Sequence, residues 1–188
     1  ALEQASHINL YNEARKDLDR QMTEQATNQV SQMEGLDERR AIVVYNEEWH
    51  KGIIGIVASR VTEQYYRPAV VLTRTGDMAT GSARSVTGFD VYKAIHSCAD
   101  LLENFGGHPY AAGLTLPAEN VEEFTRRFEE YVTHHILDEQ TQASLDITAV
   151  LDFQDVNFDF YQQLRKFAPF GPGNERPLFC THRVYDYG

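Results

Sequence analysis

The residues best suited to chemistry lie in a glycine-rich segment, FGGHPYAAG, at positions 105–113. Gly106 and Gly107 allow positive φ and a close approach of the backbone to a ligand, and their peptide N–H groups could surround an anion. His108 adds a ring donor that is charged or neutral near pH 7. The segment predicts an anion site, although a helix stop followed by a structural loop histidine gives the same pattern.

A second candidate is the segment GSARS at positions 81–85. Strand alternation places Ser82 and Arg84 on one face, and Ala83 and Ser85 on the other. A guanidinium beside short hydroxyl donors is well suited to holding phosphate. A surface arginine on an edge strand is the alternative. Because both segments could belong to one sheet, we interpret them together.

A third candidate is the loop WHKG at positions 49–52, which brings His50 and Lys51 to the start of a predicted helix. Helix N-termini bind anions, but the loop lacks the full Walker or dinucleotide pattern, and a surface loop anchored by Trp49 also explains it. No HExxH, CxxC or GxSxG motif occurs. No metal site is predicted in the chain.

The elements that would position these residues alternate between helices and strands. Apolar spacing predicts helices over 1–34, 52–65 and 90–105 and from 117 onward, and strands over 41–45, 68–74, 78–85 and 111–116. Gly106-Gly107 is expected to stop the third helix. This order predicts an α/β fold with a mixed sheet flanked by helices. A long linker helix over 1–35, a domain over 36–144 and an incomplete β-rich segment over 145–188 are expected.

Charge and composition restrict the class of function. The 188 residues are 42% hydrophobic and carry a net charge of -11, which argues for a packed core and against a broad electrostatic binder of nucleic acid. Residues 41–116 hold 7 acidic and 6 basic residues, so a local phosphate clamp remains compatible. Two distant cysteines suggest a reducing, cytoplasmic location, and no apolar run is long enough to span a membrane.

Several segments together resemble one family. WHKGIIGIVASR, RPAVVLT, GSARS, GFDVYKAI, LLENFGGHPYAAGLTL and PFGPGN occur in this order. They resemble the RecJ single-strand-specific DNA exonucleases of the DHH phosphoesterase superfamily. The resemblance implies that 36–144 is a DHH-associated substrate-binding domain, that 145–188 begins an OB-fold domain, and that 1–35 leads from a catalytic DHH domain.

The resemblance also implies a division of labour. In such enzymes the DHH domain holds Mn²⁺ or Mg²⁺ for phosphodiester hydrolysis, while the associated domain grips the nucleic acid. The Asp-His-His and Asp-x-Asp metal motifs are absent from this sequence. We therefore expect the chain to bind no metal, to be inactive alone, and to serve a 5′-to-3′ exonuclease of DNA repair and recombination. Its expected partners are single-stranded DNA and the DHH domain of the same polypeptide.

The matching positions define the expected DNA-binding residues. They are Ser82, Arg84, Ser85, Gly106, Gly107 and His108, to which the loop adds His50 and Lys51. His108 is also a candidate catalytic group that would stabilise transition-state charge. Two other functions are kept as alternatives. One is a DHH-family phosphoesterase acting on nanoRNA, cyclic dinucleotides or adenosine bisphosphate, and the other is a nonenzymatic interaction module.

Overall fold

The computed structural model describes residues 2–185 and divides the chain into two compact units, Ala1–Gln142 and Ala143–Gly188. The first unit is built on a five-stranded sheet with the strand order β1-β2-β3-β5-β4. The strands are β1 (Ile42–Tyr45), β2 (Ala69–Thr75), β3 (Met78–Arg84), β4 (Asn104–His108) and β5 (Ala111–Pro117). β1 and β2 are parallel, joined through α2 (Ile54–Tyr65), and the other neighbours are antiparallel.

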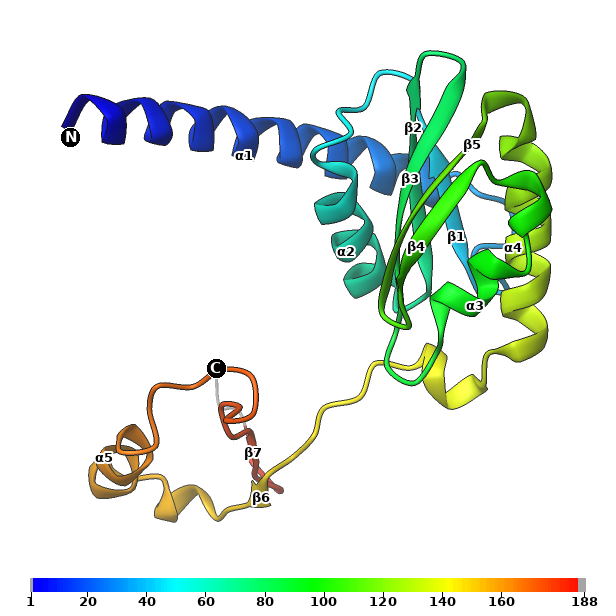
Figure 1. Cartoon of the computed structure of the whole chain (residues 1–188). Coiled ribbons are helices and arrows are strands. Elements are labelled where there is room, and N and C mark those ends of the chain that lie inside the picture. Colours follow the sequence, from blue (N-terminus) through cyan, green and yellow to red (C-terminus); the bar gives the residue numbers. More distant parts are fainter. Residues whose placement is uncertain (1, 186–188) are drawn as a thin grey trace. The chain divides into compact units, whose positions relative to one another are not determined.

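Helices cover the two faces of this sheet unequally. α1 (Leu2–Ser31) and α2 lie on one face, and α3 (Val91–His96) and α4 (Val121–His135) lie on the other (Figure 1). β1 is buried on both faces, since Ile42 and Val44 pack with α1 and α2 while Val43 packs in the opposite core. This double burial explains why the sequence of β1 is continuously apolar.

On the α2 side of the sheet, the helices cover the strands only as far as β3. Ala79 and Ala83 point into the core beneath α3 and α4 and are fully buried, whereas Ser82 and Arg84 on the α2 side are only partly buried. Next to them, Gly106 of β4 and Gly113 of β5 are exposed. The sheet is therefore covered by α2 over its first strands and uncovered beyond β3.

The predicted fold class, an α/β fold with a mixed sheet flanked by helices, is confirmed. The predicted helix over 90–105 is wrong. Asp90 caps α3 as expected, but α3 ends at His96, a 3-10 turn (Ala99–Leu101) follows, and β4 begins at Asn104. Phe105 continues the helical apolar spacing, yet it pairs with Leu114 and contacts Tyr92 of α3. Pairing with β5 also gives the two poor helix formers after Phe105 a full set of strand partners.

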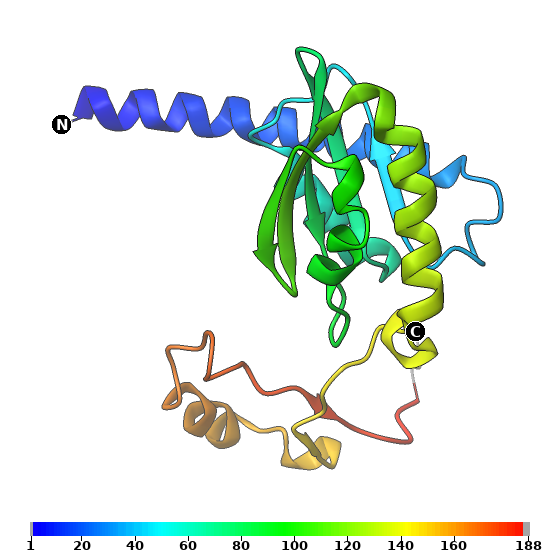
Figure 2. The ribbon, with the colours of Figure 1, turned by 45° about the vertical axis from the view of Figure 1, so that its right-hand side comes forward.

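The apolar stripe predicted along α1 is confirmed where α1 meets α2. Met22, Ala26 and Val30 are buried in the core shared with α2, and α1 ends at Ser31, slightly before the expected breaker (Figure 2). Trp49 donates its indole N–H to Gln25 at 2.7 Å. The second half of α1 is thus part of the core of the first unit.

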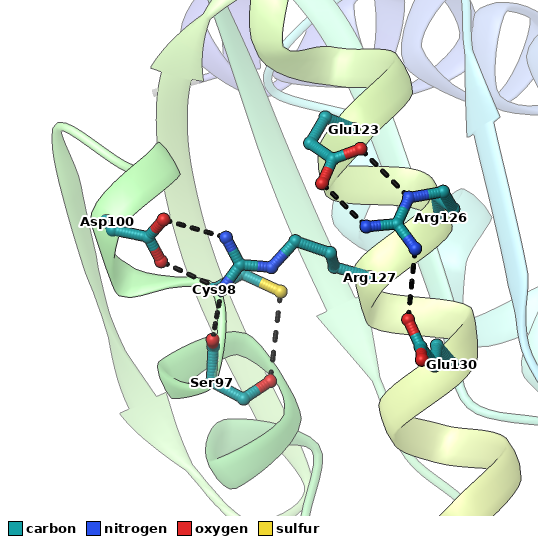
Figure 3. Close-up of polar contacts among 7 residues, drawn as sticks. All are labelled: Ser97, Cys98, Asp100, Glu123, Arg126, Arg127 and Glu130. Atoms are coloured by element: carbon teal, nitrogen blue, oxygen red, sulfur yellow. Dashed lines mark hydrogen bonds and ion pairs between the residues drawn. The ribbon is translucent and has the colours of Figure 1, made fainter.

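The opposite helix, α4, is tied to the segment that follows α3. Arg127 donates two hydrogen bonds to the carboxylate of Asp100, at 2.7 and 2.9 Å, and a third to the carbonyl of Ser97 at 2.9 Å (Figure 3). Arg126 pairs with Glu123 and Glu130 on the same helix. Arg127 therefore helps to hold the turn from which β4 starts.

The remaining elements are short. 3-10 turns occupy Ala118–Asn120, Asp138–Thr141 and Phe153–Asp155. The second unit contains α5 (Phe158–Arg165) and a two-stranded parallel ladder of β6 (Ala149–Val150) and β7 (Phe179–Cys180), shorter than the strand patterns suggested. Among the described residues, no helix is both long and apolar enough to cross a bilayer.

Candidate functional site

Arg84, at the end of β3, is a partly buried cation held by neutral groups. Its Nη1 donates to the hydroxyl of Ser82 and to the carbonyl of Ala83, both at 2.8 Å, and its Nε donates to the hydroxyl of Ser59 at 3.2 Å. Among the side chains described, residues 11–185, no carboxylate forms an ion pair with it. Burial lowers the pKa of Arg84 because it disfavours the charged form. A guanidinium in this environment is well placed to accept an anion.

Arg84 lines an open hollow of about 580 Å³ together with residues of α2, here called the Arg84 hollow. Its walls are Gly52, Gly55, Ile56, Ser59, Arg60, Glu63 and Arg84. A Cβ at Gly55 would lie 3.0 Å from Nη2 of Arg84 and 3.3 Å from Oγ of Ser82. Gly55 therefore gives the guanidinium the space to lie against the helix.

The start of α2 adds a favourable dipole to this hollow. No acidic residue lies in the first turn of α2, and in the described chain no side chain caps its first N–H groups. The positive end of the helix dipole is therefore not neutralised by an acid on its own first turn. Together with Arg84 it favours a negatively charged ligand.

The sheet register brings the two sequence motifs together. Arg84 is directly opposite Ala111 on β5, and Ala111 is directly opposite His108 on β4. Directly paired residues point to the same face, so His108 shares the α2 side of the sheet with Arg84, at two strand spacings or roughly 10 Å between Cα atoms. Ser82 likewise faces Gly113, which pairs with Gly106.

The surface between these motifs is bare backbone. A Cβ at Gly106 would meet nothing within 4 Å, and one at Gly113 would meet only a carbonyl oxygen at 3.9 Å. We name the α2-side surface formed by Gly106, His108, Ala111 and Gly113 the open face. It adjoins the Arg84 hollow, and apart from the ring of His108 it carries no side chain larger than a methyl group, so a ligand backbone could lie directly on it.

His108 presents a hydrogen-bond donor beside the open face. Its Nδ1 accepts the backbone N–H of Tyr110 at 3.3 Å. In the neutral ring the proton is therefore assigned to Nε2, which is left to donate outward. His50 has the same arrangement, since its Nδ1 accepts the N–H of Gly52 at 3.1 Å. Both histidines can therefore donate to a phosphate oxygen from the other ring nitrogen.

Gly107 shapes the strand rather than forming the anion-binding loop that the sequence suggested. Both Gly106 and Gly107 are paired within β4, opposite Gly113 and Ala112. Gly107 has φ of +151°, and a Cβ there would lie 2.8 Å from that of Ala112. The backbone conformation at position 107 requires glycine. At position 106, glycine leaves the open face without a side chain.

Three other residues predicted for the site are less clearly part of it: Ser85, His50 and Lys51. The hydroxyl of Ser85 donates to the carbonyl of Phe89 at 2.7 Å, on the face opposite Arg84, so it serves a turn. His50 and Lys51 are exposed in the loop before α2, next to Gly52 at the rim of the Arg84 hollow. The structure thus groups Ser82, Arg84, Gly106 and His108 on one side of the sheet.

Three residues of α2 were not predicted for the site. Besides Gly55, they are Ser59, whose hydroxyl accepts from Arg84, and Arg60, which is half-exposed in the hollow and pairs with Asp19 of α1 at 2.7 Å. The sequence feature that could have indicated them is the spacing of Gly55 and Ser59. They are four residues apart and lie outside the apolar stripe of the helix.

A divalent metal does not fit the residues described here. Among the side chains of residues 11–185, no group of three or more from His, Cys, Asp and Glu is arranged to hold a metal ion. No chemical step on this chain is therefore assigned to a metal ligand of its own.

Comparison with known proteins identifies the family to which this fold belongs. The DHHA1 domain model matches residues 38–134, which contain the Arg84 hollow and the open face, and the RecJ OB domain model matches residues 147–186. The first unit is thus a DHHA1 domain. With its OB segment, the chain belongs to the RecJ family.

Individual relatives agree with this assignment. The chain is 36% identical to the single-stranded-DNA-specific exonuclease RecJ of Bacillus subtilis over 94% of its length, and 32% identical to that of Salmonella typhimurium over 93%. The crystal structure of Thermus thermophilus RecJ with Mn²⁺ superposes with a TM-score of 0.81 at 27% identity and covers 94% of this chain. The chain spans 22% and 32% of the two relatives and 25% of that structure.

Proposed function

We propose that this chain is the part of a RecJ-type 5′-to-3′ exonuclease, acting in DNA repair and recombination, that grips the phosphate backbone of single-stranded DNA. Arg84 and Ser82 hold one phosphate in the Arg84 hollow. His108 donates to a phosphate on the open face. Hydrolysis belongs to a DHH domain of the same polypeptide, which holds Mn²⁺ or Mg²⁺, and the chain alone is inactive.

The observation that carries this proposal is the environment of the Arg84 guanidinium. A guanidinium that is partly desolvated, held by two hydroxyls and a carbonyl and unpaired with any described carboxylate lacks a counter-charge. A phosphate oxygen supplies that charge and matches the fork of donors. The bare surface next to it leaves room for the rest of a nucleotide chain.

The relatives support the choice of substrate. The Bacillus subtilis and Salmonella typhimurium relatives are single-stranded-DNA-specific exonucleases, and the Thermus thermophilus enzyme has been crystallised with Mn²⁺ and with Mg²⁺. The match of residues 147–186 to a RecJ OB domain favours a long single strand over a dinucleotide, because OB folds bind single strands by stacking and backbone contacts.

Substitution of Arg84 in the full-length exonuclease tests the proposal. Arg84→Ala should raise KM for 5′-phosphorylated single-stranded DNA about tenfold to a hundredfold, the loss expected for a charge-assisted hydrogen bond of about 1.5–3 kcal/mol. Arg74→Ala is the matched control, since Arg74 is a strand arginine that pairs with Glu47 outside the site. Equal kinetics for Arg84→Ala and Arg74→Ala would contradict the proposed grip.

A further inference from the structure

Tyr110 is an exposed aromatic residue at the edge of the proposed phosphate site. It is 58% exposed, and the other large apolar side chains of the first unit described as exposed are Tyr11 and Leu137, near the two ends of the unit. Other aromatic rings of the first unit pack into its core, either completely, as Phe124 and Phe128 do, or in part, as Tyr92 and Phe105 do. Exposure alone assigns no role to a single aromatic residue, so any role of this ring depends on where it lies.

The backbone of Tyr110 is fixed on both sides. Its carbonyl accepts the N–H of Ser85 at 3.0 Å, and its own N–H donates to Nδ1 of His108. Tyr110 lies in the two-residue turn between β4 and β5, next to Ala111, which pairs directly with Arg84. Its backbone is therefore anchored two residues after His108 and is hydrogen-bonded to the residue that follows Arg84.

The aromatic ring of Tyr110 contacts the imidazole ring of His108. The two ring centroids are 6.3 Å apart and the planes are inclined by 62°, an edge-to-face contact. This contact restrains the ring before any ligand binds, so ordering it on binding costs little conformational entropy. Its exposed surface remains available to a flat ligand.

We infer that Tyr110 is a stacking platform for a base of the single strand whose phosphates Arg84 and His108 hold. This inference rests on the proposed function and names a further contact of the same site. Stacking on an aromatic ring accepts every base, because every base has a π-face. The platform therefore suits a nuclease that must advance along any sequence, and it adds affinity without base specificity.

Kinetics with abasic DNA in the full-length exonuclease separate stacking from other roles. Tyr110→Ala should raise KM for a 5′-phosphorylated strand about tenfold, whereas Tyr110→Phe, which keeps the ring, should change KM less than twofold. On a strand whose first three nucleotides are abasic, wild type should already show the higher KM, and Tyr110→Ala should add little. Thermal unfolding of each variant controls for stability.

Two results would overturn the stacking role. If Tyr110→Ala raises KM equally on normal and abasic strands, Tyr110 acts through the protein, for example by holding His108 or packing on another domain. If Tyr110→Ala leaves KM unchanged on both strands, no base stacks on this ring. Arg84→Ala distinguishes these failures from a failure of the phosphate grip, because it should weaken normal and abasic strands alike.

Discussion

Gly106 and Gly107 are neighbours in sequence with opposite steric requirements. A Cβ at Gly106 would enter open space, while one at Gly107 would overlap the backbone of Ala111 and the side chain of Ala112. The positive φ of Gly107 adds conformational strain for any other residue. The pair therefore allows the fold and the ligand surface to be tested separately.

Gly106→Val should leave the thermal stability of the protein unchanged while lowering its affinity for single-stranded DNA, because the added side chain occupies the open face. Gly107→Ala should instead destabilise the fold, by at least about 1 kcal/mol, since the backbone there must change. Thermal unfolding and DNA titration of both variants check this. Unchanged affinity in a folded Gly106→Val protein would mean that DNA does not lie on the open face.

At the scale of residues, the sequence predicted part of the site. Strand alternation correctly placed Ser82 with Arg84 and away from Ser85. The contributions of Gly55 and Ser59 could not be predicted, because they depend on how α2 lies against β3. Such a contact joins segments far apart in the chain, and the four-residue spacing of Gly55 and Ser59 does not by itself identify it.

At the scale of elements, the error over 90–105 has a clear physical origin. The apolar spacing that begins at Val91 continues to Phe105, so periodicity alone favours one helix. The chain instead leaves α3 at His96, because residues 104–108 find a partner strand in β5. Pairing between strands is a tertiary choice that overrides a local periodicity.

The ion pair between α4 and the turn after α3 predicts a pH effect on stability. Hydrogen bonds from Arg127 lower the pKa of Asp100 below its ordinary value near 3.8. A carboxylate with a lowered pKa stabilises the fold above its unfolded-state pKa and loses that contribution as pH falls through the folded-state pKa. Asp100→Asn should therefore lower the melting temperature more at pH 7 than near pH 3, because the contribution of the carboxylate declines once the pH falls below 3.8. An equal difference at both pH values would contradict this.

At the scale of the whole molecule, the net charge of -11 is reconciled with DNA binding by its distribution. Residues 41–116 are nearly neutral and carry the Arg84 hollow and the open face, while residues 1–40 and 117–144 supply -8 of the net charge. Salt limits the reach of those distant charges to about 8–10 Å. A few local phosphate contacts, rather than a broad basic surface, are therefore expected.

The most direct measurement is an NMR titration of residues 1–188 with a 5′-phosphorylated single-stranded oligonucleotide at low and at physiological salt, which detects even weak binding. We predict that the largest shift changes occur at Ser82, Arg84 and His108 and that binding weakens with salt. Arg84→Ala should reduce the salt slope of log affinity by about one, the value for one lost phosphate contact. Binding that is identical in wild type and Arg84→Ala, or no shift changes at these residues, would contradict the account.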